Sequence, residues 1–174
     1  ANGTDRYLAR AGRGVFFATD SARNCAFPLD GPVQTSYRAE LKAVLHVMRT
    51  AGVRTIVMCD CKSVVDTFNR YVQGHLDPHQ FLAERDLREQ ISERIQSDQP
   101  EFVMVRWMPS HLDEDHKVTE RSAALHKGLV TEHDVWANAQ ADLLAKQGAS
   151  QHRSTHSELA FAQDRRRVAC IVQK

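Results

Sequence analysis

The chain has 174 residues, of which 42% are hydrophobic and 26% are charged, and its formal net charge is +1 at pH 7. This length suits one domain with a sizeable core, and the composition excludes collagen-like, mucin-like and wholly disordered proteins. The balanced charge predicts no polyanionic partner, so any nucleic-acid binding must rest on local features.

The first part of the chain predicts a loop, a hairpin, a helix and a strand. Residues 1–10 are polar and contain Gly3, which is typical of a loop. Residues 12–19 and 25–32 are strand-like segments on either side of a turn-like cluster, and together predict an antiparallel hairpin. Apolar residues at helical spacing predict a helix over 35–52. The continuous apolar run 54–60 is typical of a buried parallel strand.

The second part predicts helices, one strand and a polar insertion. In chain order, these are helices over 62–74 and 78–100, a strand over 101–108, an insertion over about 112–135 and a helix over 136–148. We expect one or two helical turns in the insertion, which could form a lid, pack against another domain or be an inert surface excursion. A hairpin followed by strand–helix–strand favours an α/β fold with a mixed sheet and helices packed on it.

The cysteine spacing fits neither a secreted disulfide framework nor a tetrahedral zinc site. The four cysteines are Cys25, Cys59, Cys61 and Cys170. Reduced, buried thiols are the simpler interpretation, and they indicate an intracellular protein of the cytoplasm or nucleus. No apolar run approaches membrane-spanning length, so we expect no membrane partner.

Two acidic residues stand where a carboxylate could have either a functional or a local role. Glu40 lies on the apolar side of its predicted helix, where it needs a partner; it could instead reach water or pair with Arg38 or Lys42. Asp60 follows an apolar strand, and ligands of open α/β sheets bind beyond such strand ends. Asp60 could equally cap the helix that begins near Lys62.

Two further candidates lie in the second part of the chain. Asp142 sits early in the predicted helix 136–148, where a carboxylate also suits the positive end of the helix dipole. Asn138, one turn earlier, is a candidate N-cap. His111 follows the strand that ends in WMPS, although a single histidine is more often structural or merely exposed.

The order of these residues resembles the type 1 ribonuclease H family. The segment QTSYRAEL with Glu40 resembles the start of that family's first helix, and VMCDCKSVVD with Asp60 resembles its acid at a strand end. WMPSHL with His111 resembles the loop that carries its mobile histidine. NAQADLLAKQGA, with Asn138 and Asp142, resembles its last acidic helix. The resemblance covers residues 1–149 and is nearest to retroelement-derived members.

The resemblance implies a ribonuclease H-like fold, a mixed central sheet flanked by helices. It also implies hydrolysis of the RNA strand of RNA:DNA hybrids by two Mg²⁺ ions, or Mn²⁺, about 4 Å apart. Glu40, Asp60 and Asp142 would be metal ligands and catalytic acids, and His111 would assist proton transfer or product release. Strand choice would come from 2′-hydroxyl contacts and hybrid shape. A reverse transcriptase or another polyprotein domain would be a neighbour.

The family's substrate-binding segment corresponds to the residues just before and at the start of the first helix. These residues are Gln34, Thr35, Ser36 and Tyr37. Ser36 and Tyr37 depart from the asparagines common in the family, and Tyr37 could equally be a core residue of its helix. The basic run Arg165–Arg167 favours a solvated helix face over a nucleic-acid contact.

The family's first acid, at the end of its first strand, has no counterpart in this sequence. Asp5 lies too far into the loop, and Asp20 leaves too few residues before Glu40 for the two strands required there. We therefore expect the chain to be part of a longer polypeptide, with residues 1–149 as an N-terminally truncated domain and residues 150–174 as a linker and helix. Very low activity of the chain alone would follow. The alternative is an inactive domain of this fold that binds nucleic acid or serves as a structural module.

Overall fold

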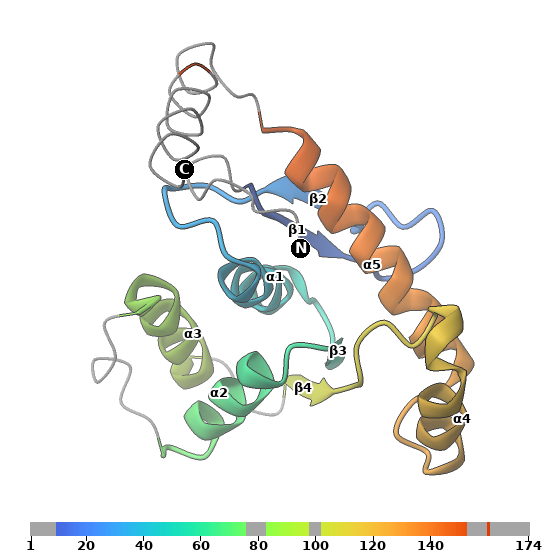
Figure 1. The fold of residues 1–174 in the computed structure, drawn as a ribbon. Helices are drawn as coiled ribbons and strands as arrows, with labels where there is room; N and C mark the ends of the chain where they lie inside the picture. The colour runs from blue at the N-terminus through green and yellow to red at the C-terminus, as the bar shows by residue number, and fades with distance from the viewer. Residues whose placement is uncertain (1–9, 76–82, 98–101, 153–159, 161–174) are drawn as a thin grey trace, which may run out of the picture.

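The computed structural model describes residues 10–75, 83–97, 102–152 and residue 160. It begins with the expected antiparallel hairpin of β1 (Gly12–Val15) and β2 (Cys25–Pro28) (Figure 1). Gly12 lies opposite Pro28, and Val15 lies opposite Cys25. Both strands are shorter than the sequence segments that predicted them.

Helix α1 (Ser36–Thr50) confirms the helical spacing of its apolar residues. The Thr35 hydroxyl accepts a hydrogen bond from the Arg38 N–H and so caps the first turn. Its buried side packs against both sheets of the molecule. The buried residues of α1 are Ala39, Leu41, Ala43, Val44, Leu45, Val47 and Met48.

The second sheet consists of β3 (Thr55–Cys59) and β4 (Val103–Trp107), which pair in parallel as expected. The helices α2 (Lys62–Val72) and α3 (Arg85–Ser97) follow β3 and share its core with α1. The predicted helix 78–100 begins later than expected, at Arg85, because residues 83 and 84 form a turn; its last predicted residues, 98–100, lie outside the described part of the chain. Its apolar position Phe81 also lies outside that part.

The predicted insertion contains more helix than expected. A 3₁₀ turn, η2 (Asp115–Lys117), leads into α4 (Val118–His126), so the insertion is helical as expected, but over more than the one or two turns predicted. The last helix, α5 (Glu132–Ser150), begins earlier than predicted because Thr131 and Asp134 form a capping box. That box lies within the polar segment 112–135 that we predicted to be an insertion.

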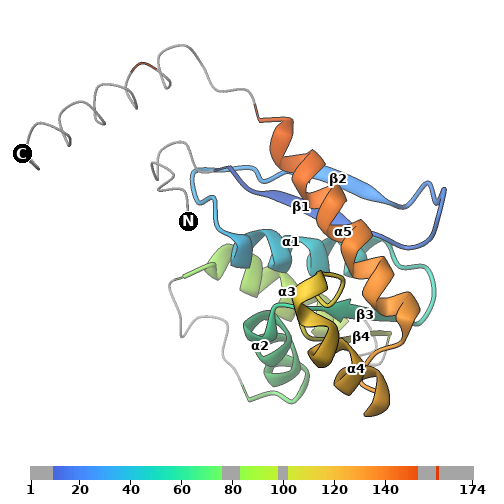
Figure 2. The same ribbon diagram turned by 45° about the vertical axis from the view of Figure 1, so that its right-hand side comes forward.

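The two sheets are separate among the described residues, with β1 paired only to β2 and β3 only to β4. Figure 2 shows α1 between the two sheets and α5 passing in front of them. Three glycines allow α5 to approach the hairpin closely. A Cβ on Gly14 would lie 2.1 Å from the Ala141 carbonyl oxygen, and one on Gly148 would lie 2.4 Å from that of Phe27.

The prediction that β3 is buried on both faces is only partly right. Cys59 is buried, but Ile56 is 47% exposed. None of the described helices is long and apolar enough to cross a membrane. The run Arg165–Arg167, Cys170 and most of the predicted C-terminal linker and helix lie outside the described residues.

Candidate active site

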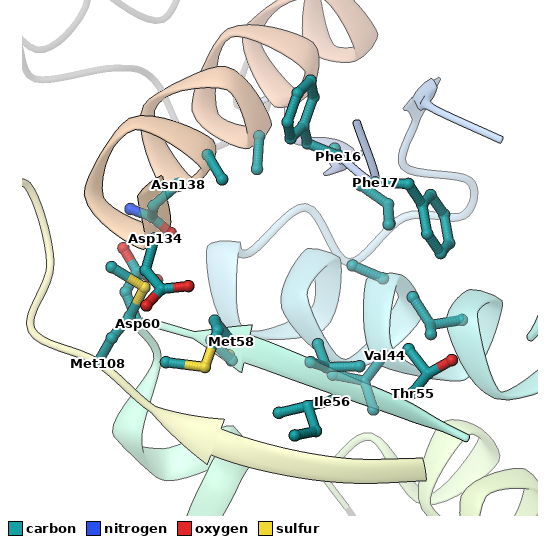
Figure 3. Close-up of a pocket in the computed structure, with 18 of the residues that line it drawn as sticks. Phe16, Phe17, Val44, Thr55, Ile56, Met58, Asp60, Met108, Asp134 and Asn138 are labelled. Atoms are coloured by element: carbon teal, nitrogen blue, oxygen red, sulfur yellow. The ribbon is translucent and has the colours of Figure 1, made fainter. Parts of the chain in front are cut away.

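A cavity of about 420 Å³ lies between the two sheets. Strands β1 and β3 and helices α1 and α5 all contribute to its wall. In Figure 3, Asp60 and Met108 lie at one end of this cavity, and Phe17 and Thr55 lie at the other. Three predicted acidic residues, Glu40, Asp60 and Asp142, line it from three different elements.

Glu40 projects into this cavity from α1 and does not form the local ion pairs that the sequence left open. Arg38 pairs with Glu84 and with Asp86, and Lys42 pairs with Asp30. Both neighbouring cations are therefore engaged on other surfaces of the helix. The Glu40 carboxylate is left facing the other acids.

Burial raises the pKa of the Glu40 carboxyl to about 7, and the negative charges of Asp60 and then Asp142 add to the increase. The Cys59 Sγ lies 3.8 Å from Glu40 Oε2, and this contact lowers the pKa by a smaller amount. Burial also raises the pKa of the Cys59 thiol, with the Glu40 charge as the next cause. Cys59 is thus a neutral, buried neighbour of the carboxylate.

Asp60 follows the last residue of β3 and does not cap α2. The N-cap position of that helix is Cys61, which makes no side-chain capping bond. The strand-end interpretation is therefore the one that the geometry supports, because the Asp60 carboxyl lines the cavity at the carboxyl end of β3.

Asp142 lies in the middle of α5, so the proposed interaction with the positive end of a helix dipole is wrong. Asn138 is likewise no N-cap, since α5 is capped by Thr131; it lines the cavity one turn before Asp142. Burial, followed by the charge of Asp60, raises the pKa of Asp142, while His111 and Lys146 lower it. The negative charge of Asp60 therefore raises the pKa values of both Glu40 and Asp142.

His111 lies beside Asp142, although its side chain is 53% exposed. Its Nδ1 is 3.5 Å from Asp142 Oδ2 and 3.7 Å from Glu114 Oε1. The backbone of His111 has a φ of 55°, in the left-handed region. Sequence reasoning did not identify Glu114, although its i+3 spacing from His111 was a usable signal. Asp134, which also lines the cavity, was missed because the start of α5 was misplaced.

The expected substrate-binding segment has local structural roles. The Gln34 side chain accepts from the Ala11 N–H and donates to the carbonyls of Leu29 and Gly31. Tyr37 Oη lies 3.3 Å from Thr67 Oγ1 and accepts a hydrogen bond from Arg88, so it joins α1 to α2 and α3. Ser36 is exposed at the start of α1. None of the four residues 34–37 lines the cavity that holds the acids.

The donor set suits a hard divalent cation, because carboxylate oxygens are the preferred ligands of Mg²⁺ and Mn²⁺. Burial is the largest cause of the raised pKa values of Glu40 and Asp142, and repulsion from Asp60 adds to it; a bound cation would stabilise both ionised carboxylates. In the described part of the chain, however, no three acidic, histidine or cysteine side chains form a ready-made metal cluster. The carboxylate groups of the site suit a metal ion, but the described residues alone do not form a complete set of metal ligands.

The family model for RNase H matches residues 3–150 of this chain. The chain belongs to the RNase H family. It is similar to a ribonuclease H from Schizosaccharomyces pombe, with 28% identity over 143 residues. That match covers 82% of this chain and 47% of the yeast protein, so the chain spans about half the length of this curated relative.

The fold is also that of an RNase H domain. The solution structure of the PFV RNase H domain matches with a TM-score of 0.53 and 20% identity. The match covers 81% of this chain and 82% of the PFV domain. The expected mixed α/β fold of the RNase H family is therefore confirmed, and the acids described above lie within the matched residues.

Proposed function

We propose that the protein hydrolyses the RNA strand of RNA:DNA hybrids. The observation that carries this proposal is the convergence of Glu40, Asp60 and Asp142 from three elements on one cavity of an RNase H family domain. A chain that served only as a structural module would have no use for three mutually repelling carboxylates in a partly buried site.

Glu40, Asp60 and Asp142 are the residues that would bind Mg²⁺, or Mn²⁺ in its place. When bound, two such ions activate the attacking water and stabilise the leaving oxygen of a phosphodiester. The carboxylates themselves must be ionised to act as ligands, so the raised pKa of Glu40 predicts that cation binding releases a proton near neutral pH.

His111 is the group suited to proton transfer beside this centre. Its exposed ring lies 3.5 Å from an Asp142 carboxylate oxygen, which places an imidazole at the edge of the proposed centre. The hybrid would be recognised by its shape and its 2′-hydroxyls. We retain Gln34, Thr35, Ser36 and Tyr37 as its proposed contacts. Thr35 and Ser36 are exposed, whereas the Gln34 amide would have to exchange its present partners.

The test is cleavage of a hybrid labelled on the RNA strand, in Mg²⁺, by the purified protein. We expect cleavage, and Asp60→Asn should reduce kcat by more than about a hundredfold, because metal ligation supplies several kcal/mol of transition-state stabilisation. Asp66→Asn is the matched control, since Asp66 is an exposed partner of Lys62 on the neighbouring helix. Unchanged cleavage in Asp60→Asn would refute the site, and no cleavage by the unmodified polypeptide would favour an inactive module.

A further inference from the structure

The surface between the hairpin and α1 brings aromatic and basic side chains together. Phe27 of β2 is 43% exposed, and the guanidinium carbon of Arg13 on β1 lies 4.9 Å from the centre of its ring. The ring centre of His46 on α1 lies 6.1 Å from that of Phe27. Arg49, one turn after His46 on the same helix, is exposed. We call Arg13, Phe27, His46 and Arg49 the aromatic–basic patch.

The patch lies on the face of the hairpin that is turned away from α5. A Cβ on Gly12 or Gly14 would collide with the backbone of α5, so these two positions of β1 face that helix. Arg13 lies between them and therefore faces the opposite side. Phe27 shares this side because it is the cross-strand partner of Arg13. The hairpin thus presents glycines to α5 and the patch to the side of α1.

The patch is also separate from the candidate active site. At about 100° per residue, His46 and Arg49 project about 120° and 180° away from Glu40 around the axis of α1. None of the four patch residues lines the cavity that holds the acids. A ligand on the patch therefore need not contact the candidate metal ligands.

The two arginines of the patch have neutral partners in the described part of the chain. Arg49 donates a hydrogen bond to the side-chain carbonyl of Gln90. Arg13 lies over the Phe27 ring, and its Nε is buried without a hydrogen-bond partner. Burial, and then the charges of Arg13 and Arg49, lower the pKa of His46. Both positive charges therefore act on the same part of the surface.

One exposed carboxylate near the patch belongs to a different pair. Asp30 forms an ion pair with Lys42, and the Asp30 side chain is 75% exposed. The hydrogen bond from Lys42 is the largest cause of the lowered pKa of Asp30, and the charge of Arg13 is the smallest. Asp30 therefore balances the charge of Lys42 rather than that of the patch.

An aromatic face bordered by cations suits one class of polyanion. In single-stranded nucleic acid, exposed bases stack on aromatic rings while the phosphates pair with arginines. A double helix keeps its bases stacked within itself, and an acidic peptide would contact the arginines without using the ring. Single-stranded nucleic acid therefore fits both kinds of side chain in the patch.

We propose that the aromatic–basic patch binds a single strand of nucleic acid, with a base stacked on the exposed part of the Phe27 ring and adjacent phosphates paired with Arg13 and Arg49. These contacts involve no 2′-hydroxyl, so RNA and DNA should bind alike. The site goes beyond the proposed hydrolysis of hybrids and does not depend on it, because the patch needs neither the acids nor a metal ion.

The test is binding of a fluorescently labelled oligothymidylate of ten nucleotides to the purified protein, followed by anisotropy in EDTA. We expect a Kd of about 1–100 µM at 0.15 M salt, in the range of binding without sequence preference. An abasic oligonucleotide of the same length keeps the phosphates but lacks the bases, so its Kd should be at least about fivefold higher. A duplex of ten base pairs should also bind more weakly than the single strand.

Substitutions of Phe27 test the stacking contact. Phe27→Leu keeps an apolar side chain but removes the aromatic face, and should raise the Kd for oligothymidylate about 5- to 100-fold. Phe27→Trp retains a stacking surface and should bind at least as tightly as the unmodified protein. Met104→Leu is the control, because Met104 is similarly exposed, at 42%, but lies on β4.

A second matched pair tests the phosphate contact. Arg49→Gln should lower the slope of log Kd against log salt concentration by about 0.7, the effect of losing one phosphate contact to a single strand. Arg70→Gln removes an exposed arginine from the last turn of α2 and should leave the slope unchanged. Circular dichroism and Tm of each variant without oligonucleotide establish that it is folded.

Four results would overturn the proposal. They are absence of binding, equal binding of the abasic oligonucleotide, an unchanged Kd in folded Phe27→Leu, and equal salt slopes for the two arginine variants. A peptide of ten glutamates that binds as tightly as the oligonucleotide would instead assign the patch to an acidic protein partner. Because every readout is binding in EDTA, a failure here is distinct from a failure of the proposed nuclease activity.

Discussion

The β3–β4 half of the molecule and the β1–β2 half are held together in different ways. The parallel pair shares one continuous core with α1, α2 and α3, which includes Leu41, Val64 and Ile91. The hairpin shares a much smaller cluster with α1 and otherwise meets α5 through glycines, backbone against backbone. Glu40 and Asp60 come from the first half, and Asp142 comes from α5. The geometry of the candidate active site therefore depends on how the well-packed half and the sparsely packed half are positioned relative to each other.

The largest stability effect should come from the core of the β3–β4 half. Leu41→Ala removes a side chain that is 1% exposed and should lower the free energy of unfolding by about 2–5 kcal/mol, measured in urea. Leu143→Ala on α5, where the side chain is 50% exposed, should change it by less than about 0.5 kcal/mol. Equal losses in the free energy of unfolding for the two variants would show that both halves contribute equally to stability.

The charge cluster that joins the halves should make stability fall as pH rises. The pKa of Glu40 is raised from 4.5 to about 7 in the folded state, so between these values the native protein binds more protons than the unfolded chain. The resulting stability is present below about pH 4.5 and is lost as pH rises through 7, a change of about 3 kcal/mol.

Glu40→Gln should remove this dependence, and in EDTA the variant should be more stable than the unmodified chain at pH 7.5 and equally stable at pH 4.5. Urea unfolding at both pH values measures the difference. Glu120→Gln, at an exposed carboxylate of α4, is the control and should preserve the original pH profile. A Glu40→Gln variant that is destabilised equally at both pH values would contradict the burial and repulsion described above.

The contact between the hairpin and α5 should be sensitive to a single methyl group. A Cβ at Gly14 would lie 2.1 Å from the Ala141 carbonyl oxygen, so Gly14→Ala must displace α5 and should cost about 1–3 kcal/mol. Gly52→Ala, with no atom within 4 Å of the added carbon, should be neutral within about 0.5 kcal/mol. Thermal unfolding compares them, and equal Tm values would contradict a tight backbone contact.

The smallest effect tests the start of α5. Thr131→Ala removes the capping-box hydroxyl that accepts from the Asp134 N–H and should cost about 1 kcal/mol. Thr119→Ala, on the exposed surface of α4, should change stability little, because alanine is favourable within a helix. If both substitutions are neutral, the capping box makes no measurable contribution to stability.

Local patterns predicted the elements whose apolar residues face one buried side. The spacing in α1 and the apolar run of β3 sufficed, because each packs on a core large enough to impose that pattern. Helix α4 was predicted only as one or two helical turns, because Ala124 is its one buried residue and its sequence therefore shows little of the pattern of a helix with a buried side. The start of α5 was missed because its capping box lies in the same polar segment.

The candidate site was only partly predictable for a different reason. Whether Glu40 pairs locally depends on Arg38, and Arg38 is engaged by Glu84 and Asp86, more than forty residues away in the chain. Spacing cannot reveal such long-range partners. The order of the acids carried the family resemblance instead, and the matched RNase H model confirms that family over residues 3–150.

The glycine contacts between the hairpin and α5 also determine how sharply Asp142 is positioned. Peptide groups have no rotamers, so a helix that rests on backbone atoms at Gly12, Gly14 and Gly148 has few ways to slide or rotate as side chains fluctuate. His111, by contrast, comes from a loop and is more than half exposed. The site thus combines an acid on a helix held by close backbone contacts with a more exposed histidine on a loop.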